Sequence, residues 1–212
     1  MKKYDLQVHT DASPCSRASP EDVVEAALEA GLDGIAITNH DTLEGFDAVN
    51  TLAPADLTVI PGVEVTTTQG HLLALNVNKA PPQDDPLIVI ESIHDQDGLA
   101  ILSHPFDKLR EYYTDNLDEI ASMIDGVEVL NSRCLIPQYN QNARSFAEKH
   151  SLTITGGSDA HFPMEVGRAY TMCDEPILDA IREGTTETGG RGGYFSGHVA
   201  TKLNDALAYL NL

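Results

Sequence analysis

Short apolar segments alternate with amphipathic segments along the chain. The apolar segments, rich in valine, isoleucine and leucine, predict strands at residues 4–8, 34–38, 57–65, 71–77, 100–103, 126–130 and 152–155. The amphipathic segments predict helices at residues 20–30, 43–50, 86–96, 117–124, 141–150, 177–182 and 199–210. This alternation predicts a parallel α/β architecture, and the number of strands favours a barrel over an open sheet.

The length of 212 residues is typical of one domain, and no internal repeat divides the chain. We therefore expect residues 1–212 to form a single domain. Residues 185–197 are rich in glycine, threonine and serine, which predicts a mobile loop before the expected C-terminal helix at 199–210.

The charge balance is strongly acidic, with 13 lysine and arginine residues against 33 aspartate and glutamate residues and a net charge of −20. Such a surface repels phosphate backbones and acidic membranes at long range, so we expect neither as a partner. A small phosphorylated substrate would need local cations. The aspartate-rich, lysine-poor excess favours a halophilic protein, because high salt screens self-repulsion.

The cysteines Cys15, Cys134 and Cys173 lie far apart, are odd in number and form no Cys-x-x-Cys pair, which is not the pattern of a disulfide framework. Asp5 stands where the apolar region of a signal peptide would begin, and no apolar run approaches the ~20 residues of a membrane helix. These patterns predict a cytoplasmic protein and leave open a monomer or a small homo-oligomer.

Five of the eight histidines fall at the ends of predicted strands, where active sites of barrel enzymes form. They are His9, His40, His71, His104 and His161, and Glu64 and Asp159 lie at the same ends. Imidazole and carboxylate donors suit Zn²⁺, Mn²⁺ or Fe²⁺, and a carboxylate can bridge two ions. The pattern therefore predicts a centre for divalent metal ions.

The same residues belong to motifs that follow one another along most of the chain. They are Asp5-Leu6-x-Val8-His9-Thr10, Thr38-x-His40-Asp41-Thr42, Gly62-Val63-Glu64, His104-Pro105 and Gly157-Ser158-Asp159-Ala160-His161. In this order they resemble the PHP (polymerase and histidinol phosphatase) family. The resemblance implies a distorted seven-stranded (β/α) barrel, TIM-like, with up to three divalent ions at the C-terminal strand ends. It also implies a metal-dependent phosphoesterase.

The resemblance further implies which residues hold the two to three ions. The first ion would bind His9, Glu64 and Asp159. Glu64 would bridge to a second ion that also binds His71 and His104. The third would bind His40 and His161, with its remaining ligand in the loop after the first strand, either Cys15 as a thiolate or Asp11.

Gln7 departs from the family pattern, which has a histidine two residues before His9. Residues two apart on a strand share a face, so Gln7 and His9 are expected at one site. A glutamine carbonyl is a neutral, weak oxygen donor that matches Zn²⁺ poorly and Mn²⁺ or Mg²⁺ better. We therefore expect the first ion site to be weaker than is usual in the family.

Two arginines lie at the predicted ligand face, where a guanidinium would match the geometry of a phosphate. Arg17 follows the loop after the first strand, and Arg133 lies in Asn131-Ser132-Arg133 after the sixth. Small nucleotide-phosphate members of the family often carry Asn-Ser-Arg at this point. In the expected reaction, ions around Glu64 activate water, and Asp159 or His161 moves a proton to the leaving group.

These expectations predict hydrolysis of a small phosphate monoester, such as a nucleotide phosphate or an RNA end. One alternative is a degenerate module that binds metal or nucleotide without turnover, because Gln7 replaces a ligand. Another is an exonuclease that acts on short oligonucleotides. The sequence leaves these alternatives open.

Overall fold

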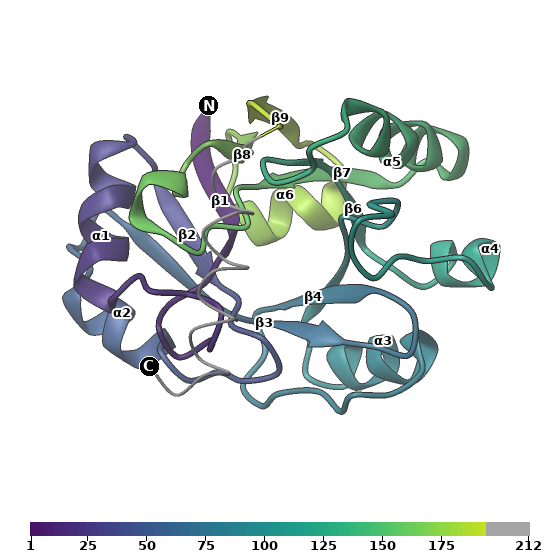
Figure 1. Ribbon diagram of the computed structural model, residues 1–212, viewed down its shortest axis with the longest axis horizontal. Helices are drawn as coiled ribbons and strands as arrows, with labels where there is room; N and C mark the ends of the chain where they lie inside the picture. Colours follow the sequence, from purple (N-terminus) through teal and green to yellow (C-terminus); the bar gives the residue numbers. More distant parts are fainter. Residues whose placement is uncertain (194–212) are drawn as a thin grey trace.

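A single sheet curls into a nearly closed barrel in the computed structural model, which describes residues 1–193 (Figure 1). Its strands are β1 Lys2–Val8, β2 Gly34–Ile37, β3 Thr58–Thr66, β4 His71–Leu75, β5 Leu99–Ser103, β6 Gly126–Asn131, β7 Thr153–Gly157, β8 Ala169–Cys173 and β9 Glu187–Gly190. The sheet order is β7-β6-β5-β4-β3-β2-β1-β8-β9. The predicted strands are present as β1 to β7, so the TIM-like barrel is confirmed, although β8 and β9 add to the expected seven.

The helices lie where the amphipathic segments predicted them, with boundaries shifted by a few residues. They are α1 Pro20–Glu29, α2 Phe46–Leu52, α3 Pro86–His94, α4 Leu117–Ala121, α5 Pro137–His150 and α6 Ile177–Glu183, with a short 3-10 helix η1 at Pro163–Glu165. The predicted helix at 199–210 lies outside the described residues. Among residues 1–193, no helix has the length and apolar character needed to cross a membrane.

Two expectations about the strands were wrong. β4 runs antiparallel to both β3 and β5, although a parallel architecture was predicted. The reason is the tight turn at residues 67–70, where the Thr67 N–H donates to the Gly70 carbonyl at 3.1 Å, because a parallel connection needs a crossover of a dozen or more residues. Residues 185–197 were expected to form a mobile loop, and this was wrong for Glu187–Gly190, which form β9 and pair with β8; residues 194–197 lie outside the described residues.

The barrel closes where β1 meets the segment that follows β7. Val8 forms an isolated parallel bridge with Ala160, and the His9 N–H donates to the Ala160 carbonyl at 2.9 Å. Buried Asp5 strengthens the join, since its carboxylate accepts the N–H groups of Ser158 and Gly167, each at 2.8 Å. The polar ends of the first and last predicted strands therefore meet.

Side chains alternate along the strands between the barrel interior and its outer face. Ile60 of β3 and Leu73 and Leu75 of β4 belong to an inner cluster that also contains Ile177 and Ile181 of α6. α6 therefore covers one end of the barrel interior. Figure 1 shows α1 and α2 outside one part of the sheet and α3 outside another.

The same alternation places polar side chains at the opposite end of the barrel. Glu64 is four residues beyond Ile60 on the inward face of β3, and His71 precedes Leu73 on the inward face of β4. Because β4 is antiparallel, its first residue lies at the end where the neighbouring parallel strands finish. This geometry brings the predicted donors together.

Candidate metal centre

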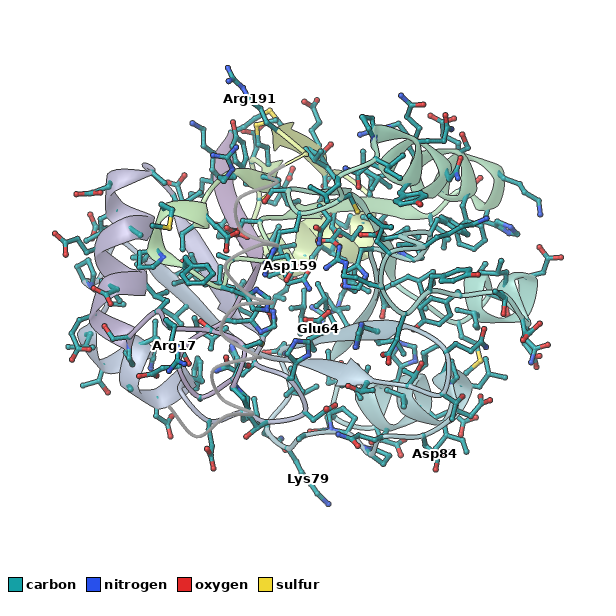
Figure 2. The ribbon with its side chains drawn as sticks, viewed as in Figure 1. Arg17, Glu64, Lys79, Asp84, Asp159 and Arg191 are labelled. Atoms are coloured by element: carbon teal, nitrogen blue, oxygen red, sulfur yellow. The ribbon has the colours of Figure 1, made fainter. Side chains whose placement is uncertain are left out.

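Donor side chains from several strands meet at the end of the barrel away from α6. They are His9 after β1, His40 after β2, Glu64 in β3, His71 in β4, His104 after β5, and Asp159 and His161 after β7. Figure 2 shows Glu64 and Asp159 close together near the middle of the barrel, while Lys79 and Arg191 point outward at the periphery. All of the histidines predicted from the strand ends lie in this cluster.

Glu64 occupies the middle of the cluster, and its side chain is 1% exposed. Its Oε2 lies 3.0 Å from His9 Nε2 and 3.7 Å from His40 Nδ1. Its Oε1 lies 3.1 Å from His104 Nε2 and 3.8 Å from His71 Nδ1. The two oxygens thus face different imidazoles, which is the arrangement of a carboxylate able to bridge two ions.

Asp159 divides its oxygens between the imidazoles and a guanidinium. Its Oδ1 lies 3.5 Å from both His9 Nε2 and His161 Nδ1. Its Oδ2 accepts hydrogen bonds from Arg110 Nη1 and from Asn131 Nδ2. One oxygen is therefore directed at the donor cluster while the other is held by the protein.

Sequence reasoning missed Arg110, which comes from the loop after β5. Besides Asp159, its guanidinium donates to Asp107 Oδ2 at 2.9 Å and to Asn131 Oδ1 at 3.3 Å. The available signal was a cation six residues after His104, in a loop that follows a strand ending in donor residues. Its contacts with Asp159 and Asn131 depend on β6 and β7, so they required the fold.

The donors fit divalent ions. Within the described residues, three groups have ligand atoms that all lie within 4.8 Å of one another: His9, His40 and His161; His40, Glu64 and His71; and His9, Glu64 and Asp159. His9 Nε2 and Glu64 Oε2 are buried, close together and without a partner in hydrogen-bond geometry. Buried polar atoms without partners are costly, and a bound cation would satisfy both.

The charges of the metal-free centre follow from its burial and its neighbours. Burial raises the pKa of Glu64, but the positive potential of His40 and the close contacts with His104 and His9 hold it well below its usual range. Burial likewise raises the pKa of Asp159, but Arg110 and His9 hold it well below. Both carboxyls are thus anionic, which favours binding of cations.

The pKa values of His9 and His161 are shifted in opposite directions. Burial lowers the pKa of His9, but contacts with Asp159 and Glu64 outweigh burial and raise the pKa to about 9. Burial and the neighbouring positive charge of His9 hold the pKa of His161 well below its usual range. Metal ligation requires neutral imidazole, so an ion must displace a proton from His9 but not from His161.

Two of the predicted ligands have a left-handed backbone conformation. The φ angle is 57° at Asp159 and 27° at His104, which non-glycine residues seldom adopt. At His104 the main-chain N–H donates to Glu128 Oε2 at 2.8 Å, which holds this conformation. Such strain is typical of functional sites, where the surrounding structure over-determines a residue.

Gln7 lies at a bulge in β1 and is fully buried. Its Oε1 accepts hydrogen bonds from Asn131 Nδ2 at 3.2 Å and from Ser103 Oγ at 3.4 Å. Its Nε2 is buried without a hydrogen-bond partner. The amide thus contacts neighbouring polar residues of β5 and β6, and its role as a metal ligand stays a prediction.

The loop after β1 does not complete a ligand group with His40 and His161. Cys15 is half-buried and Asp11 is exposed, and neither belongs to a close donor group in the described part of the chain. The residue that joins His40 and His161 in such a group is His9. The assignment of Cys15 or Asp11 to a third ion also stays a prediction.

The two predicted phosphate-binding arginines both adjoin His161. The Arg17 N–H donates to the His161 carbonyl at 3.1 Å, and the Arg17 side chain is exposed. Arg133 is buried, with Nε 3.7 Å from Glu165 Oε1, while Glu165 Oε2 accepts the His161 N–H at 2.7 Å. Glu165, which sequence reasoning missed, therefore links Arg133 to His161.

Comparison of the sequence with known families and proteins gives three findings. A family model described as PHP-associated matches residues 137–186. An uncharacterised protein of Methanocaldococcus jannaschii is 31% identical over 179 residues, which cover 82% of this chain and 71% of that protein. The 5'-3' exoribonuclease of Salmonella typhimurium is 36% identical over 178 residues, which cover 81% of this chain and 51% of the enzyme. The chain thus spans about half the length of the exoribonuclease.

A solved structure from Bacteroides vulgatus shares the fold. It is a two-domain protein described as containing a predicted PHP-like metal-dependent phosphoesterase, and it aligns with a TM-score of 0.77 at 20% identity over 90% of this chain and 65% of that one. The fold, the family model and a relative of which the chain covers more than two thirds lead to one conclusion: the chain belongs to the PHP family of metal-dependent phosphoesterases.

Proposed function

We propose that the protein hydrolyses a small phosphate monoester, such as a nucleotide phosphate or the terminal phosphate of an RNA end. The observation that carries this proposal is the position of Glu64, whose two oxygens face two different sets of imidazoles. When bound there, divalent ions would activate water near neutral pH and neutralise charge on the phosphoryl group.

The chain's own residues would prepare the centre and bind the substrate. Asp159 offers one oxygen to the donor cluster because Arg110 and Asn131 hold the other. Arg133 and Arg17, which adjoin His161, would bind phosphoryl oxygens. In a chain of net charge −20, such local cations are needed to attract a phosphate.

Proton transfer to the leaving group would fall to Asp159 or His161. Arg110 and His9 keep the pKa of Asp159 well below its usual range, which makes it a poor proton donor. The His161 Nδ1 lies 2.9 Å from the main-chain oxygen of Asp159, a contact that orients the ring. Burial and the neighbouring positive charge of His9 likewise hold the pKa of His161 well below its usual range, so the metal-free centre does not favour one of the two residues over the other.

A second candidate function is exonuclease activity on short oligonucleotides. The specific support is the 36% identity to the Salmonella exoribonuclease over most of this chain. The acidic surface argues against long nucleic acids, so the substrate would be a short oligonucleotide. Both functions use the same centre and differ in whether a monoester or a diester is cleaved.

The test is an assay of purified protein with Mn²⁺, Zn²⁺ or Mg²⁺, at low and high salt, on an aryl phosphate, a nucleoside monophosphate and a dinucleotide. We expect turnover of monoesters and a loss of about 100-fold in Glu64→Gln. Glu25→Gln, an exposed position on α1, is the matched control and should keep full activity. Preference for the dinucleotide would favour the exonuclease.

No turnover of any substrate under these conditions would overturn both enzymatic proposals. In that case Gln7→His tests the degenerate module. A gain of metal content and activity from near zero in Gln7→His would support a module that lost its reaction through this residue.

A further inference from the structure

Gln7 is fully buried beside the donor cluster, and the direction of its amide follows from the direction of the Asn131 amide. Asn131 Oδ1 accepts the Arg133 N–H at 2.9 Å and a hydrogen bond from Arg110 Nη2 at 3.3 Å, so this atom is the oxygen. Asn131 Nδ2 is therefore a donor, and it lies 3.2 Å from the Gln7 amide. The Gln7 atom that faces it must be an acceptor, because two donors form no hydrogen bond, so this atom is Oε1.

The amide of Gln7 offers no free lone pair to a cation. An amide oxygen has two lone pairs, and Gln7 Oε1 faces two hydrogen donors, Asn131 Nδ2 at 3.2 Å and Ser103 Oγ at 3.4 Å. Gln7 Nε2 is a donor only, and it is buried without a hydrogen-bond partner. Since a cation binds to lone pairs, neither end of this amide suits an ion.

The two carboxylates each turn one oxygen towards His9. His9 Nε2 lies 3.0 Å from Glu64 Oε2 and 3.5 Å from Asp159 Oδ1. An ion held by these three residues would therefore use these two oxygens. Three protein donors are typical of catalytic metal sites, in which a further position stays open for water or substrate.

Gln7 is connected to the other oxygen of each carboxylate. Ser103 Oγ lies 3.4 Å from both Gln7 Oε1 and Glu64 Oε1, so these two oxygens share its one hydroxyl hydrogen. Asn131 Nδ2 lies 3.2 Å from Gln7 Oε1 and 3.3 Å from Asp159 Oδ2. The side chains that make these connections are buried, which limits their freedom to move.

We propose that Gln7 binds no ion and is instead a positioning residue, which keeps the carboxylates of Glu64 and Asp159 in place through two intermediate hydrogen-bond donors. Gln7 is then compatible with turnover, because the ion beside His9 keeps an open position. The inference extends the proposed function, since it takes ions at this centre as given. Its measurements need no turnover, so the two proposals can fail separately.

The first test asks whether Gln7 is a ligand. The chelated protein is saturated with Co²⁺, whose visible absorption spectrum depends on the number and geometry of its ligands, and circular dichroism confirms that each variant folds. We expect Gln7→Leu to keep the wild-type spectrum, whereas His9→Leu, which removes a donor of the cluster, should shift it. Gln138→Leu, at an exposed position on α5, is the matched control and should also keep the spectrum. A shift in Gln7→Leu like that in His9→Leu would overturn the proposal.

The second test measures the affinity for Mn²⁺, from the electron paramagnetic resonance signal of the free ion. We expect the affinity to fall about tenfold in Gln7→Leu, because residues that orient metal ligands typically contribute about 10–100-fold. Ser103→Ala should also lower the affinity. The double variant should lose less than the product of the two single losses, because both substitutions break the same connection to Glu64.

Two results of the second test would overturn the positioning role. One is an unchanged affinity in Gln7→Leu, and the other is a loss in the double variant equal to the full product. If Gln7→Leu does not fold, Ser103→Ala decides alone, and an unchanged affinity in that variant would overturn the proposal.

Discussion

Arg110 supplies the positive charge beside Asp159 when no metal ion is bound. Replacing Arg110 should therefore destabilise the metal-free protein more than the metal-loaded protein. The guanidinium pairs with Asp159 and Asp107, which are at most 2% exposed. Removing one partner of a buried ion pair costs about 3–5 kcal/mol, because the other charge is left without compensation. Since 21% of the Arg110 side chain is exposed, we expect Arg110→Met to lose about 3 kcal/mol, at the lower end.

Bound ions should reduce this loss. A divalent ion on Asp159 supplies the positive charge that the substitution removes, so the remaining cost is that of the hydrogen bonds to Asn131 and Asp107. Such bonds contribute about 1 kcal/mol in net terms. Since two such bonds are lost, the destabilisation should fall from about 3 to about 2 kcal/mol when the protein is saturated with Mn²⁺.

The assay is urea unfolding followed by circular dichroism, with a chelator and with saturating Mn²⁺, at the same high salt. Arg182→Met on α6 is the matched control, because this arginine is 38% exposed and pairs only with exposed acids among the described residues. It should change the free energy of unfolding by less than about 1 kcal/mol in both conditions. Equal destabilisation by Arg110→Met in both conditions, or none with chelator, would refute the reasoning.

Two further predictions concern the parts of the barrel that support the centre. Burial raises the pKa of Asp5 to about 6, against about 3.9 in an unfolded chain, so its stabilising contribution is present below pH 4 and is lost as pH rises through 6. As pH rises from 5 to 7.5, the free energy of unfolding of the wild type should therefore fall by about 1 kcal/mol more than that of Asp5→Asn. If the difference between the urea midpoints of the two proteins stays the same at both pH values, the prediction is wrong. Leu73→Ala, in the inner cluster beneath His71, should cost about 2–5 kcal/mol by leaving a cavity, whereas Leu52→Ala, 44% exposed on α2, should cost far less in the same unfolding assay.

The strands and most of the donors could be predicted from the sequence because both depend on local pattern. Apolar runs marked β1 to β7, and histidines at their ends mark one end of any barrel built from them. The antiparallel course of β4 was also within reach, since residues 67–70 are too few for a crossover. β9 was not, because Glu187, Gly189 and Gly190 have low strand propensity and depend on pairing with β8.

The electrostatic support of the centre could not be predicted from local pattern. Arg110, Asn131 and Glu165 reach the donors only after loops from β5, β6 and β7 converge. The partners of Gln7 could not be predicted from local pattern either, because Gln7 lies at a bulge in β1 and its amide accepts hydrogen bonds from Asn131 and Ser103 of other strands. Contacts of this kind depend on residues far apart in the chain, so single positions carry little signal for them.

The hairpin between β3 and β4 makes one donor depend on the length of a turn. Thr66 pairs with His71, and this register places His71 and Leu73 on the inward face. A slip of one residue moves every side chain of a strand to the opposite face. Inserting or deleting a single residue at 67–70 would thus direct Leu72 towards the ions and turn His71 to the outer surface, so turn length is itself a determinant of the metal centre.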